Sequence, residues 1–309
     1  MTLPVIFDCD PGHDDAIALL MAFASSKFDI QVVTITGGNQ TLAKTVRNAK
    51  RILSFAKITG PILAAGRDKP LFRELEIAPQ VHGDSGLDGP YLPESDYPLD
   101  PRPAIEVMKA YLEKSVEPMT IIATGPLTNI GLLLMTYPKL KSKIKQISLM
   151  GGSIVGGNWT PSAEFNILVD PEAAQIVFRS GIPIFMAGLD VTHLALVMPE
   201  DTERIRLLGT KVAVMVAELL DFFAKFHLSM SFLGTPLHDP VAVAYLIDPT
   251  LFKTKDYYVE IDTQGEFTLG STVADVNHRY DKKANVTVLL DVDRARFIEL
   301  IVQLMASYA

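Results

Sequence analysis

Residues 5–24 read VIFDCDPGHDDAIALLMAFA, which has the pattern of a buried strand, an acidic turn and an apolar helix. The β-branched and aromatic run Val5-Ile6-Phe7 is typical of a buried strand, and the apolar run Ala16–Ala24 is typical of a helix. The same alternation continues, with further strands predicted at 32–35, 120–123, 147–150 and 184–187 and helices at 42–56, about 129–137 and about 171–180. It predicts an α/β fold with a mostly parallel central sheet flanked by helices, a Rossmann-like open sheet.

The C-terminal third follows a different pattern. From about Glu200 consecutive helical segments appear, notably Val212–Leu228, before a late strand at Val286–Val292 and a final amphipathic helix. We therefore expect a helical elaboration on the α/β core. The segment Arg67–Pro103 is rich in Pro, Gly and Asp and weakly periodic, which is typical of a functional or mobile loop. Because neither a linker nor a tandem repeat interrupts the series, residues 1–309 are predicted to form a single domain.

Composition excludes several classes of partner. The chain has 28 Lys and Arg against 36 Asp and Glu, a formal net charge of -8, which disfavours nucleic acid and anionic membrane surfaces. Cys9 is the one cysteine, so the chain has no intrachain disulfide framework and no cysteine-rich zinc cluster. The first residues lack the features of a signal peptide, and Ala16–Ala24 is too short to span a bilayer. A soluble, cytoplasmic protein is expected.

Acidic residues crowd the turn after the first strand. Asp8, Asp10, Asp14 and Asp15 place four carboxylates within eight residues, which is electrostatically costly without a compensating cation. Capping of the following helix accounts for one or two of them. The remainder indicate a hard cation, calcium or magnesium, because the chain offers neither a cysteine cluster nor a close histidine pair for zinc.

Small and amide-bearing residues follow other strands. Ligands bind at the carboxyl ends of the strands in open α/β sheets. Thr36-Gly37-Gly38-Asn39 and Ala123–Asn129 (ATGPLTN) fall at such positions, and the carbonyl of Thr124 is a plausible additional metal ligand. An ordinary turn followed by a capped helix explains either motif equally well when it is viewed alone.

Two later segments add polar side chains. Asn158, Glu164 and Asn166 can donate and accept hydrogen bonds with vicinal hydroxyls, as a sugar requires. Leu237-His238-Asp239-Pro240 supplies a further carboxylate beside a histidine. A His-Asp pair is often only the start of a helix, but here the carboxylate would complete a metal shell.

Together these motifs resemble a known family. Asp8-x-Asp10-x-x-x-Asp14-Asp15, followed in order by GGN, ATGPLTN, AEFN and HDP, is similar to the inosine-uridine-type nucleoside hydrolases over roughly residues 4–300. The segments 81–89 (VHGDSGLDG) and 158–161 (NWTP) are most similar to the bacterial pyrimidine-preferring ribonucleoside hydrolases.

The resemblance implies roles for individual residues. Asp10, Asp15, Asp239 and the Thr124 carbonyl would hold Ca²⁺, and Asp10 would also be the general base. His82 and His238 would be catalytic residues facing the base, while Asp8 would support the loop. The substrate would contact Asp14, Asn39, Met150, Asn158, Glu164, Phe165 and Asn166. The implied activity is calcium-dependent hydrolysis of ribonucleosides, pyrimidine nucleosides preferred, to ribose and free base, and the implied assembly is a homotetramer.

Other functions remain open at this stage. One alternative within the same reaction class is a nucleoside hydrolase that prefers purine nucleosides or does not discriminate between bases. An Asp-based phosphohydrolase is disfavoured, because Asp14 and Asp15 add negative charge where phosphate would bind. A non-catalytic calcium-dependent sugar-binding module would need neither a base nor the two motif histidines, and a turnover assay separates it from an enzyme.

The remaining histidines and aromatic residues have a structural interpretation first. His13, His193, His227 and His278 are expected to be surface or hydrogen-bonded structural residues. Cys9 is expected to be a small core residue that points away from its acidic neighbours. Five side chains on the predicted 212–228 helix and just beyond it have two possible roles: they stack on a base, or they belong to the core. They are Phe222, Phe223, Phe226, His227 and Met230.

Overall fold

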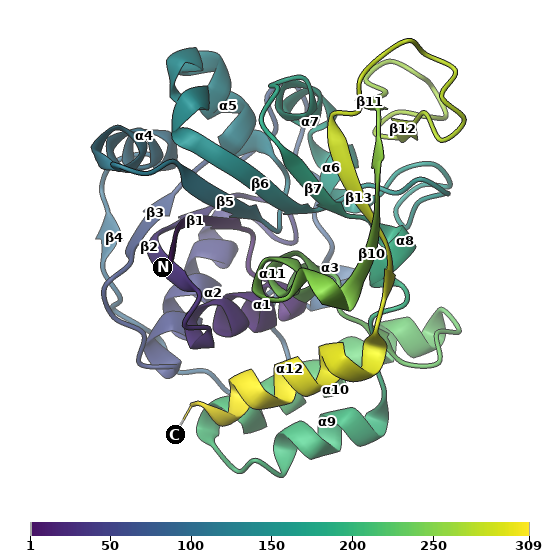
Figure 1. Ribbon diagram of the computed structural model, residues 1–309. Coiled ribbons are helices and arrows are strands. Elements are labelled where there is room, and N and C mark those ends of the chain that lie inside the picture. Colours follow the sequence, from purple (N-terminus) through teal and green to yellow (C-terminus); the bar gives the residue numbers. More distant parts are fainter. Residues whose placement is uncertain (1, 309) are drawn as a thin grey trace.

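The computed structural model describes residues 2–308 and confirms the α/β fold with a large, mostly parallel sheet (Figure 1). The nine-stranded sheet has the order β10-β13-β7-β6-β5-β1-β2-β3-β4, and β10 is antiparallel to β13 whereas the other neighbours are parallel. Its strands are β1 (Leu3–Cys9), β2 (Phe28–Ile35), β3 (Ile62–Ala65), β4 (Leu99–Asp100), β5 (Met119–Ala123), β6 (Ile144–Met150), β7 (Ile184–Ala187), β10 (Phe252–Tyr257) and β13 (Val286–Val292).

Helices cover both faces of the sheet. The apolar side chains of one face pack against α1 (His13–Ala24), α2 (Leu42–Phe55), α10 (Lys211–Ser229), α11 (Asp239–Ile247) and α12 (Arg294–Ala306). Those of the other face pack against α4 (Ala104–Lys114), α5 (Thr128–Thr136) and α7 (Pro171–Phe178). Burial on both faces explains why the central strands are continuously apolar rather than alternating.

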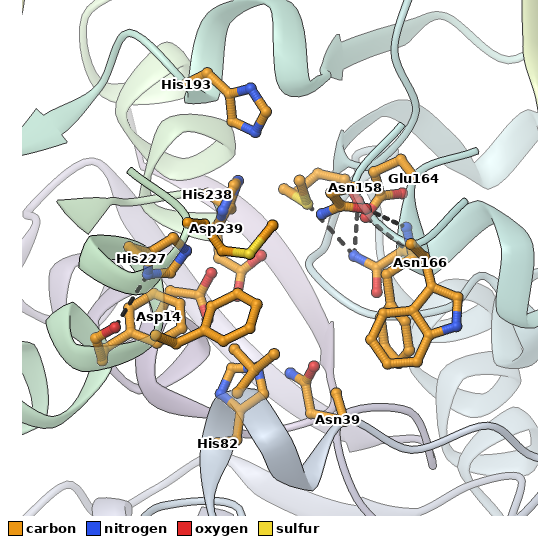
Figure 2. A pocket seen from close by; sticks show the side chains of 18 of the residues that line it. Asp14, Asn39, His82, Asn158, Glu164, Asn166, His193, His227, His238 and Asp239 are labelled. Atoms are coloured by element: carbon orange, nitrogen blue, oxygen red, sulfur yellow. Dashed lines mark hydrogen bonds between the residues drawn. The ribbon is translucent and has the colours of Figure 1, made fainter. Parts of the chain in front are cut away.

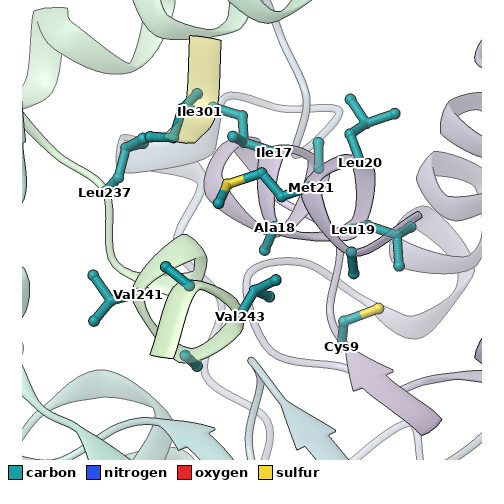
Figure 3. Close-up of a cluster of buried hydrophobic side chains, with 14 of the residues drawn as sticks. Cys9, Ile17, Ala18, Leu19, Leu20, Met21, Leu237, Val241, Val243 and Ile301 are labelled. Carbon is teal, nitrogen blue, oxygen red and sulfur yellow. The ribbon is translucent and has the colours of Figure 1, made fainter. Parts of the chain in front are cut away.

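The strand β1 shows how the two cores are separated. Val5, Phe7 and Cys9 lie in the core under α1 and α11, whereas Ile6 lies in the opposite core. Successive side chains of a strand point to opposite faces, so Cys9 turns away from the acidic residues on either side of it. Figure 3 shows Cys9 below Ala18 and Leu19 of α1, as expected for a small core residue.

The chain order creates a crevice beside β1. From β1 the chain builds outward through β2, β3 and β4, and it then returns to place β5 on the other side of β1. At such a switch point the loops after the two central strands diverge and leave room for a ligand. The motifs that follow β1, β2 and β5 therefore meet at one edge of the sheet.

The C-terminal third contains the expected helices and additional strands. The helices α9 (Pro199–Arg206), α10 and α12 form the layer seen at the bottom of Figure 1. The sequence pattern did not predict β10 or the two-stranded sheet of β11 (Val259–Ile261) and β12 (Thr272–Ala274). In β10, Phe252 and Tyr257 are buried but the four residues between them are exposed, so this edge strand has no periodic apolar face.

Short elements occupy the remaining loops. The segment 67–103 is mainly irregular, with α3 (Pro79–His82) and the two-residue β4 inside it. Elsewhere lie α6 (Phe165–Val169), α8 (Leu189–Thr192) and the pair β8 (Leu196–Val197) and β9 (Thr235–Pro236). Within residues 2–308, no helix has the length and apolar character that a bilayer crossing requires.

Candidate active site

A cavity of about 560 Å³ opens at the carboxyl ends of the central strands. Figure 2 shows His193, His227 and His238 on one side of it and Asn158, Glu164 and Asn166 on the other. The predicted site residues that line it are Asp14, Asn39, His82, Thr124, Met150, Asn158, Glu164, Phe165, Asn166, His238 and Asp239. Asp10 and Asp15, which do not line the cavity, are fully or almost fully buried close to it.

Asp15 organises the turn between β1 and α1. One carboxylate oxygen accepts hydrogen bonds from the Gly12 amide (3.0 Å) and the Asn39 side chain (2.9 Å). The other accepts from the Thr124 hydroxyl at 2.7 Å and from the Asp10 amide at 3.3 Å. Helix α1 begins at His13 with Gly12 as its N-cap, so Asp15 is the carboxylate that satisfies the helix start. The start of α1 therefore does not require the Asp14 carboxylate as a cap.

Three of the aspartates form a cluster that could hold a metal ion. Oxygen atoms of Asp14, Asp15 and Asp239 lie within 4.8 Å of one another, and none of these residues is more than 5% exposed. Burial and the Asp15 carboxylate raise the pKa of Asp14 to about 8. Burial and the carboxylates of Asp14, Asp15 and Asp10 raise the pKa of Asp239 well above its usual range. A cation is the natural compensation for this crowding.

Asp10 lies next to the cluster in a cradle made by two glycines. Its Oδ2 accepts the Asn39 amide proton at 2.6 Å, while within residues 2–308 its buried Oδ1 accepts no hydrogen bond. A Cβ on Gly38 would lie 2.1 Å from Oδ2, and one on Gly125 would lie 2.4 Å from Oδ1. These glycines therefore give the backbone close approach to a carboxylate. Burial and Asp15 raise the pKa of Asp10 well above its usual range.

Asp8 belongs to a neighbouring buried network. Its Oδ1 accepts hydrogen bonds from the Thr34 hydroxyl and, at 2.9 Å, from the Asn129 side chain. Asn129 also donates to the Ile35 carbonyl at 3.3 Å and accepts the Arg67 amide proton at 2.9 Å. Asp8 thus joins the ends of β1 and β2 to the start of α5.

The opposite wall carries oxygen and amide groups held by backbone hydrogen bonds. Glu164 is the N-cap of α6 and accepts from the amides of Asn166 (2.9 Å) and Ile167 (3.2 Å), and from Gly152 at 2.9 Å. Burial raises its pKa to about 7. The Asn166 amide donates to the Thr124 carbonyl at 3.0 Å and to the Met150 carbonyl at 3.2 Å. These bonds fix the side chains before any ligand arrives.

His82 reaches the cavity from α3 and lies against His13. The two Nδ1 atoms are 3.2 Å apart, and His13 Nε2 is 2.8 Å from the Asp88 carbonyl. The His13 ring stacks on Phe222 and Phe223 with centroid distances of 5.1 and 5.4 Å. Burial and the neighbouring His13 hold the pKa of His82 well below its usual range. The expectation that His13 is a hydrogen-bonded structural residue agrees with its position.

The other histidines form an aromatic wall. His238 Nδ1 lies 2.9 Å from the Thr192 hydroxyl, and its ring is 5.8 Å from that of His193 and 6.0 Å from that of His227. Burial, followed by the neighbouring His227, keeps the pKa of His238 well below its usual range. His227 Nδ1 is 3.0 Å from the Phe223 carbonyl. Burial lowers the pKa of His193 and His227 as well, which favours neutral rings in this wall.

Several cavity residues were not expected there. His193 was interpreted as structural, and for His227 a structural and a base-facing position were both open; both line the cavity, as do Gln80, Trp159 and Phe232. The helical spacing of Phe223, Phe226 and His227 on α10, continued by its C-cap Met230, is the signal that places these side chains on one lining face. Phe222 instead stacks on His13. No local sequence pattern predicts that His193 and Phe232 line the cavity, because packing between loops brings them there.

A family model described as inosine-uridine preferring nucleoside hydrolase matches residues 5–299. The chain belongs to this family. It is 52% identical over 311 residues to the pyrimidine-specific ribonucleoside hydrolase RihA of Shigella boydii serotype 4 (strain Sb227), with the whole of both chains covered. The same protein of Escherichia coli O157:H7 (strain EC4115 / EHEC) is also 52% identical over the full length of both chains.

A solved nucleoside hydrolase structure is also similar. The purine-preferring ribonucleoside hydrolase from Gardnerella vaginalis superposes with a TM-score of 0.93 at 32% identity, covering 99% of this chain and 98% of that one. Relatives named for opposite base preferences therefore resemble this nucleoside hydrolase, so family membership by itself does not decide which base it prefers.

Proposed function

We propose that this chain is a calcium-dependent ribonucleoside hydrolase that cleaves the N-glycosidic bond and prefers pyrimidine ribonucleosides such as uridine and cytidine. The observation that carries the proposal is one cavity that combines a buried aspartate cluster, amide and carboxylate side chains that can hydrogen-bond to hydroxyl groups, and aromatic rings. A ribonucleoside has the matching polarity, with a polyhydroxylated sugar joined to a flat base.

Asp10, Asp15, Asp239 and the Thr124 carbonyl are the proposed calcium ligands. All are hard oxygen donors of the kind that calcium prefers. The raised carboxylate pKa values and the unpartnered Asp10 Oδ1 support a cation at this position. When bound, calcium supplies positive charge that attracts a water molecule and two ribose hydroxyls. Asp14 lies in the same cluster and is proposed to bind ribose.

Asp10 is proposed as the general base. Water must lose a proton as it attacks the anomeric carbon, and a carboxylate beside it can accept that proton. Asp10 is held rigidly by the Asn39 amide and by the two glycines, so its free Oδ1 has one orientation. Asn39, Asn158, Glu164 and Asn166 are proposed to hold the ribose hydroxyls, with Met150 and Phe165 completing the substrate wall.

His82 and His238 are proposed to face the base. Cleavage leaves negative charge on the departing base, which neutral imidazole N–H groups can stabilise. Both side chains line the same cavity as the aspartates and come from α3 and the start of α11. The cavity thus contains proposed contacts for both the ribose and the base.

The preference for pyrimidines rests on the full-length relatives at 52% identity. A purine preference is the second candidate, because the similar Gardnerella structure is named purine-preferring. Release of reducing sugar from uridine, cytidine, inosine and adenosine, each with and without a chelator, tests both. Uridine and cytidine should have the highest kcat/KM, and chelation should abolish turnover.

Other outcomes of that assay would overturn parts of the proposal. Inosine ahead of uridine would reject the pyrimidine preference and keep the reaction class. Full activity after exhaustive chelation, with no metal found by elemental analysis, would reject the calcium. Binding of ribose without turnover of any nucleoside would favour a sugar-binding module, and release of phosphate from phosphate esters would favour the phosphohydrolase.

Assembly, location and domain organisation are part of the proposal. We propose one nucleoside hydrolase domain over residues 1–309, supported by a family match that extends from 5 to 299. A homotetramer and a cytoplasmic location follow from resemblance to bacterial enzymes. Light scattering of the purified protein tests the tetramer, and cell fractionation tests the location.

A further inference from the structure

His227 lies in the last turn of α10, and aromatic side chains enclose its ring. The ring makes edge contacts with Phe223, Phe226 and Phe232, at centroid distances of 4.4, 5.3 and 5.7 Å and interplanar angles of 80°, 85° and 81°. The ring of His238 is 6.0 Å away, and only 4% of the His227 surface is exposed. Packing therefore sets the plane of the His227 ring before any ligand binds.

One nitrogen of this ring is committed to the helix. His227 Nδ1 lies 3.0 Å from the carbonyl oxygen of Phe223, one turn earlier on α10. A carbonyl oxygen only accepts hydrogen bonds, so Nδ1 carries the proton. Within residues 2–308 this is the one hydrogen bond that the His227 ring makes, so no other donor competes for Nδ1.

The surroundings of His227 keep the ring neutral. A second proton on Nε2 would create a cation enclosed by three phenylalanine rings, with a hydrogen bond only to an uncharged carbonyl group. Burial of a charge without a charged partner is costly. Burial and the nearby His193 lower the pKa of His227 to about 4, although the hydrogen bond to Phe223 acts in the opposite direction. The neutral ring has its lone pair on Nε2.

The Nε2 atom of His227 is available to a ligand. His227 lines the cavity on the same side as His193 and His238. Figure 2 shows the Nδ1 hydrogen bond on one side of the ring and the other ring nitrogen directed toward the interior of the cavity. In the part of the chain that the structure describes, Nε2 has no hydrogen-bond partner. An unpaired acceptor in a buried wall costs free energy, which a donor on the ligand would offset.

The chemistry of the departing base restricts what this lone pair can contact. Cleavage of uridine leaves negative charge on uracil, spread over N1 and the two carbonyl oxygens. A lone pair directed at any of these atoms would repel the charge as it develops in the transition state. The N3–H group, on the edge of the ring away from the glycosidic bond, keeps its proton throughout. In cytosine, the exocyclic amino group is the equivalent donor.

We propose that His227 is a specificity-determining residue whose Nε2 accepts a hydrogen bond from the N3–H group of uracil or the amino group of cytosine. The inference deepens the proposed function and rests on it for the identity of the ligand. It adds His227 to His82 and His238 as a residue that contacts the base. Because its Nε2 carries no proton, His227 recognises the base and does not protonate it. A base without an N–H donor on this edge should be a poorer substrate.

The tautomer of His227 can be measured without any activity. Long-range ¹H–¹⁵N spectra of protein labelled with ¹⁵N-histidine distinguish the two ring nitrogens, and the chain has only six histidines. The signals of His227 are assigned from their loss in His227→Gln. We expect a protonated Nδ1 and an unprotonated Nε2 at neutral pH. The reverse tautomer, or a doubly protonated ring, would overturn the inference even if the enzyme hydrolyses uridine.

The ribonucleoside of pyrimidin-2-one tests the hydrogen bond to the base. This base has the same ring as uracil but carries neither N3–H nor an amino group, and it adds no bulk. Its intrinsic reactivity differs from that of uracil equally for every variant, so the ratio of kcat/KM for uridine and for this nucleoside can be compared between variants. His227→Phe keeps an aromatic ring but has no acceptor, and the ratio should fall about 10-fold.

A second variant and a control separate recognition from packing. His227→Gln, whose side-chain oxygen can accept a hydrogen bond, should keep most of the ratio, and it also serves if His227→Phe does not fold. His193→Phe removes another histidine from the same wall and should leave the ratio unchanged. An unchanged ratio in folded His227→Phe, or an equal fall in His193→Phe, would overturn the inference while uridine is still cleaved. A wild-type protein that cleaves no nucleoside would instead reject the proposed function on which the inference rests.

Discussion

The aspartate wall and the histidine wall of the cavity are built in different ways. Asp10, Asn39 and Thr124 follow the ends of the adjacent strands β1, β2 and β5, so the order of the sheet brings them together. His193, His227 and His238 come from the residue after α8, from α10 and from the start of α11, and aromatic packing holds them. A wall made by strand ends is fixed by the backbone, whereas a wall made by helices depends on how those helices pack.

This difference leads us to expect different effects on substrate selectivity from the two walls. The aspartate wall is rigid and carries the groups proposed for metal, water and ribose, which every nucleoside substrate shares. The histidine wall is formed by side chains and loops, and it is proposed to face the base, the part of the substrate that differs between nucleosides. Substitutions in the first wall should therefore affect all substrates alike, and substitutions in the second should change base preference.

Removing one ribose hydroxyl from the substrate should cause the largest fall in kcat/KM. We expect 2′-deoxyuridine to be cleaved on the order of 10⁴-fold less efficiently than uridine, because the polar groups that hold the 2′-hydroxyl would be left unpaired. Comparison of kcat/KM for uridine and 2′-deoxyuridine measures it. Efficient cleavage of 2′-deoxyuridine would contradict a rigid wall that recognises ribose.

Asp10→Asn should abolish most turnover while the fold persists. The amide fills the same space but accepts no proton, so kcat for uridine should fall by roughly 10²- to 10⁴-fold. Asp8→Asn is the matched control: Asp8 lies two residues earlier, near the end of β1, is equally buried and accepts hydrogen bonds from Asn129 and Thr34. It should keep near-normal kcat. A near-normal rate in Asp10→Asn would assign the base to another group.

His227→Ala should change base preference more than sugar preference. We expect a fall of about 10-fold in kcat/KM for uridine, from the loss of one hydrogen-bonding ring and its packing in the wall. The ratio between uridine and 2′-deoxyuridine should stay constant. Trp159, the one tryptophan of the chain, lines the cavity, so titrations with ribose and with free uracil, each followed by its fluorescence, measure binding of the two halves of the substrate. A changed deoxy ratio would show that the two walls are not independent.

The same contrast explains what the sequence could predict. Strand-to-helix alternation predicted the sheet, and residues after strand ends predicted Asp10, Asn39 and Thr124, because local sequence and sheet order suffice there. His193 and Phe232 were missed because they reach the cavity only through packing between segments distant in sequence. The edge strand β10 was missed because four of its six residues are exposed and give no apolar period.

The pH dependence of metal-free stability tests the crowded aspartates without any substrate. Burial raises the pKa of Asp14 from 3.8 to about 8 and that of Glu164 from 4.5 to about 7. A raised pKa means that the folded state binds protons more tightly than the unfolded state. The contribution of these groups is therefore complete at low pH and is lost as the pH rises through 7 and 8. Between pH 6 and pH 9 the metal-free protein should lose about 2–4 kcal/mol, a fall of roughly 3–6 °C in Tm.

Calcium should reverse this trend, because the ion binds ionised carboxylates and competes with protons. Differential scanning calorimetry with chelator and with calcium, at several pH values, measures both effects, and calcium should raise Tm more at pH 8 than at pH 6. Asp14→Asn removes one raised carboxyl group and should flatten the metal-free slope, whereas a substitution at exposed His278 should leave the slope unchanged. A metal-free Tm that stays level or rises from pH 6 to pH 9 would mean that the aspartate wall is not under electrostatic strain. The crowding of its carboxylates would then cease to be an argument for a bound cation.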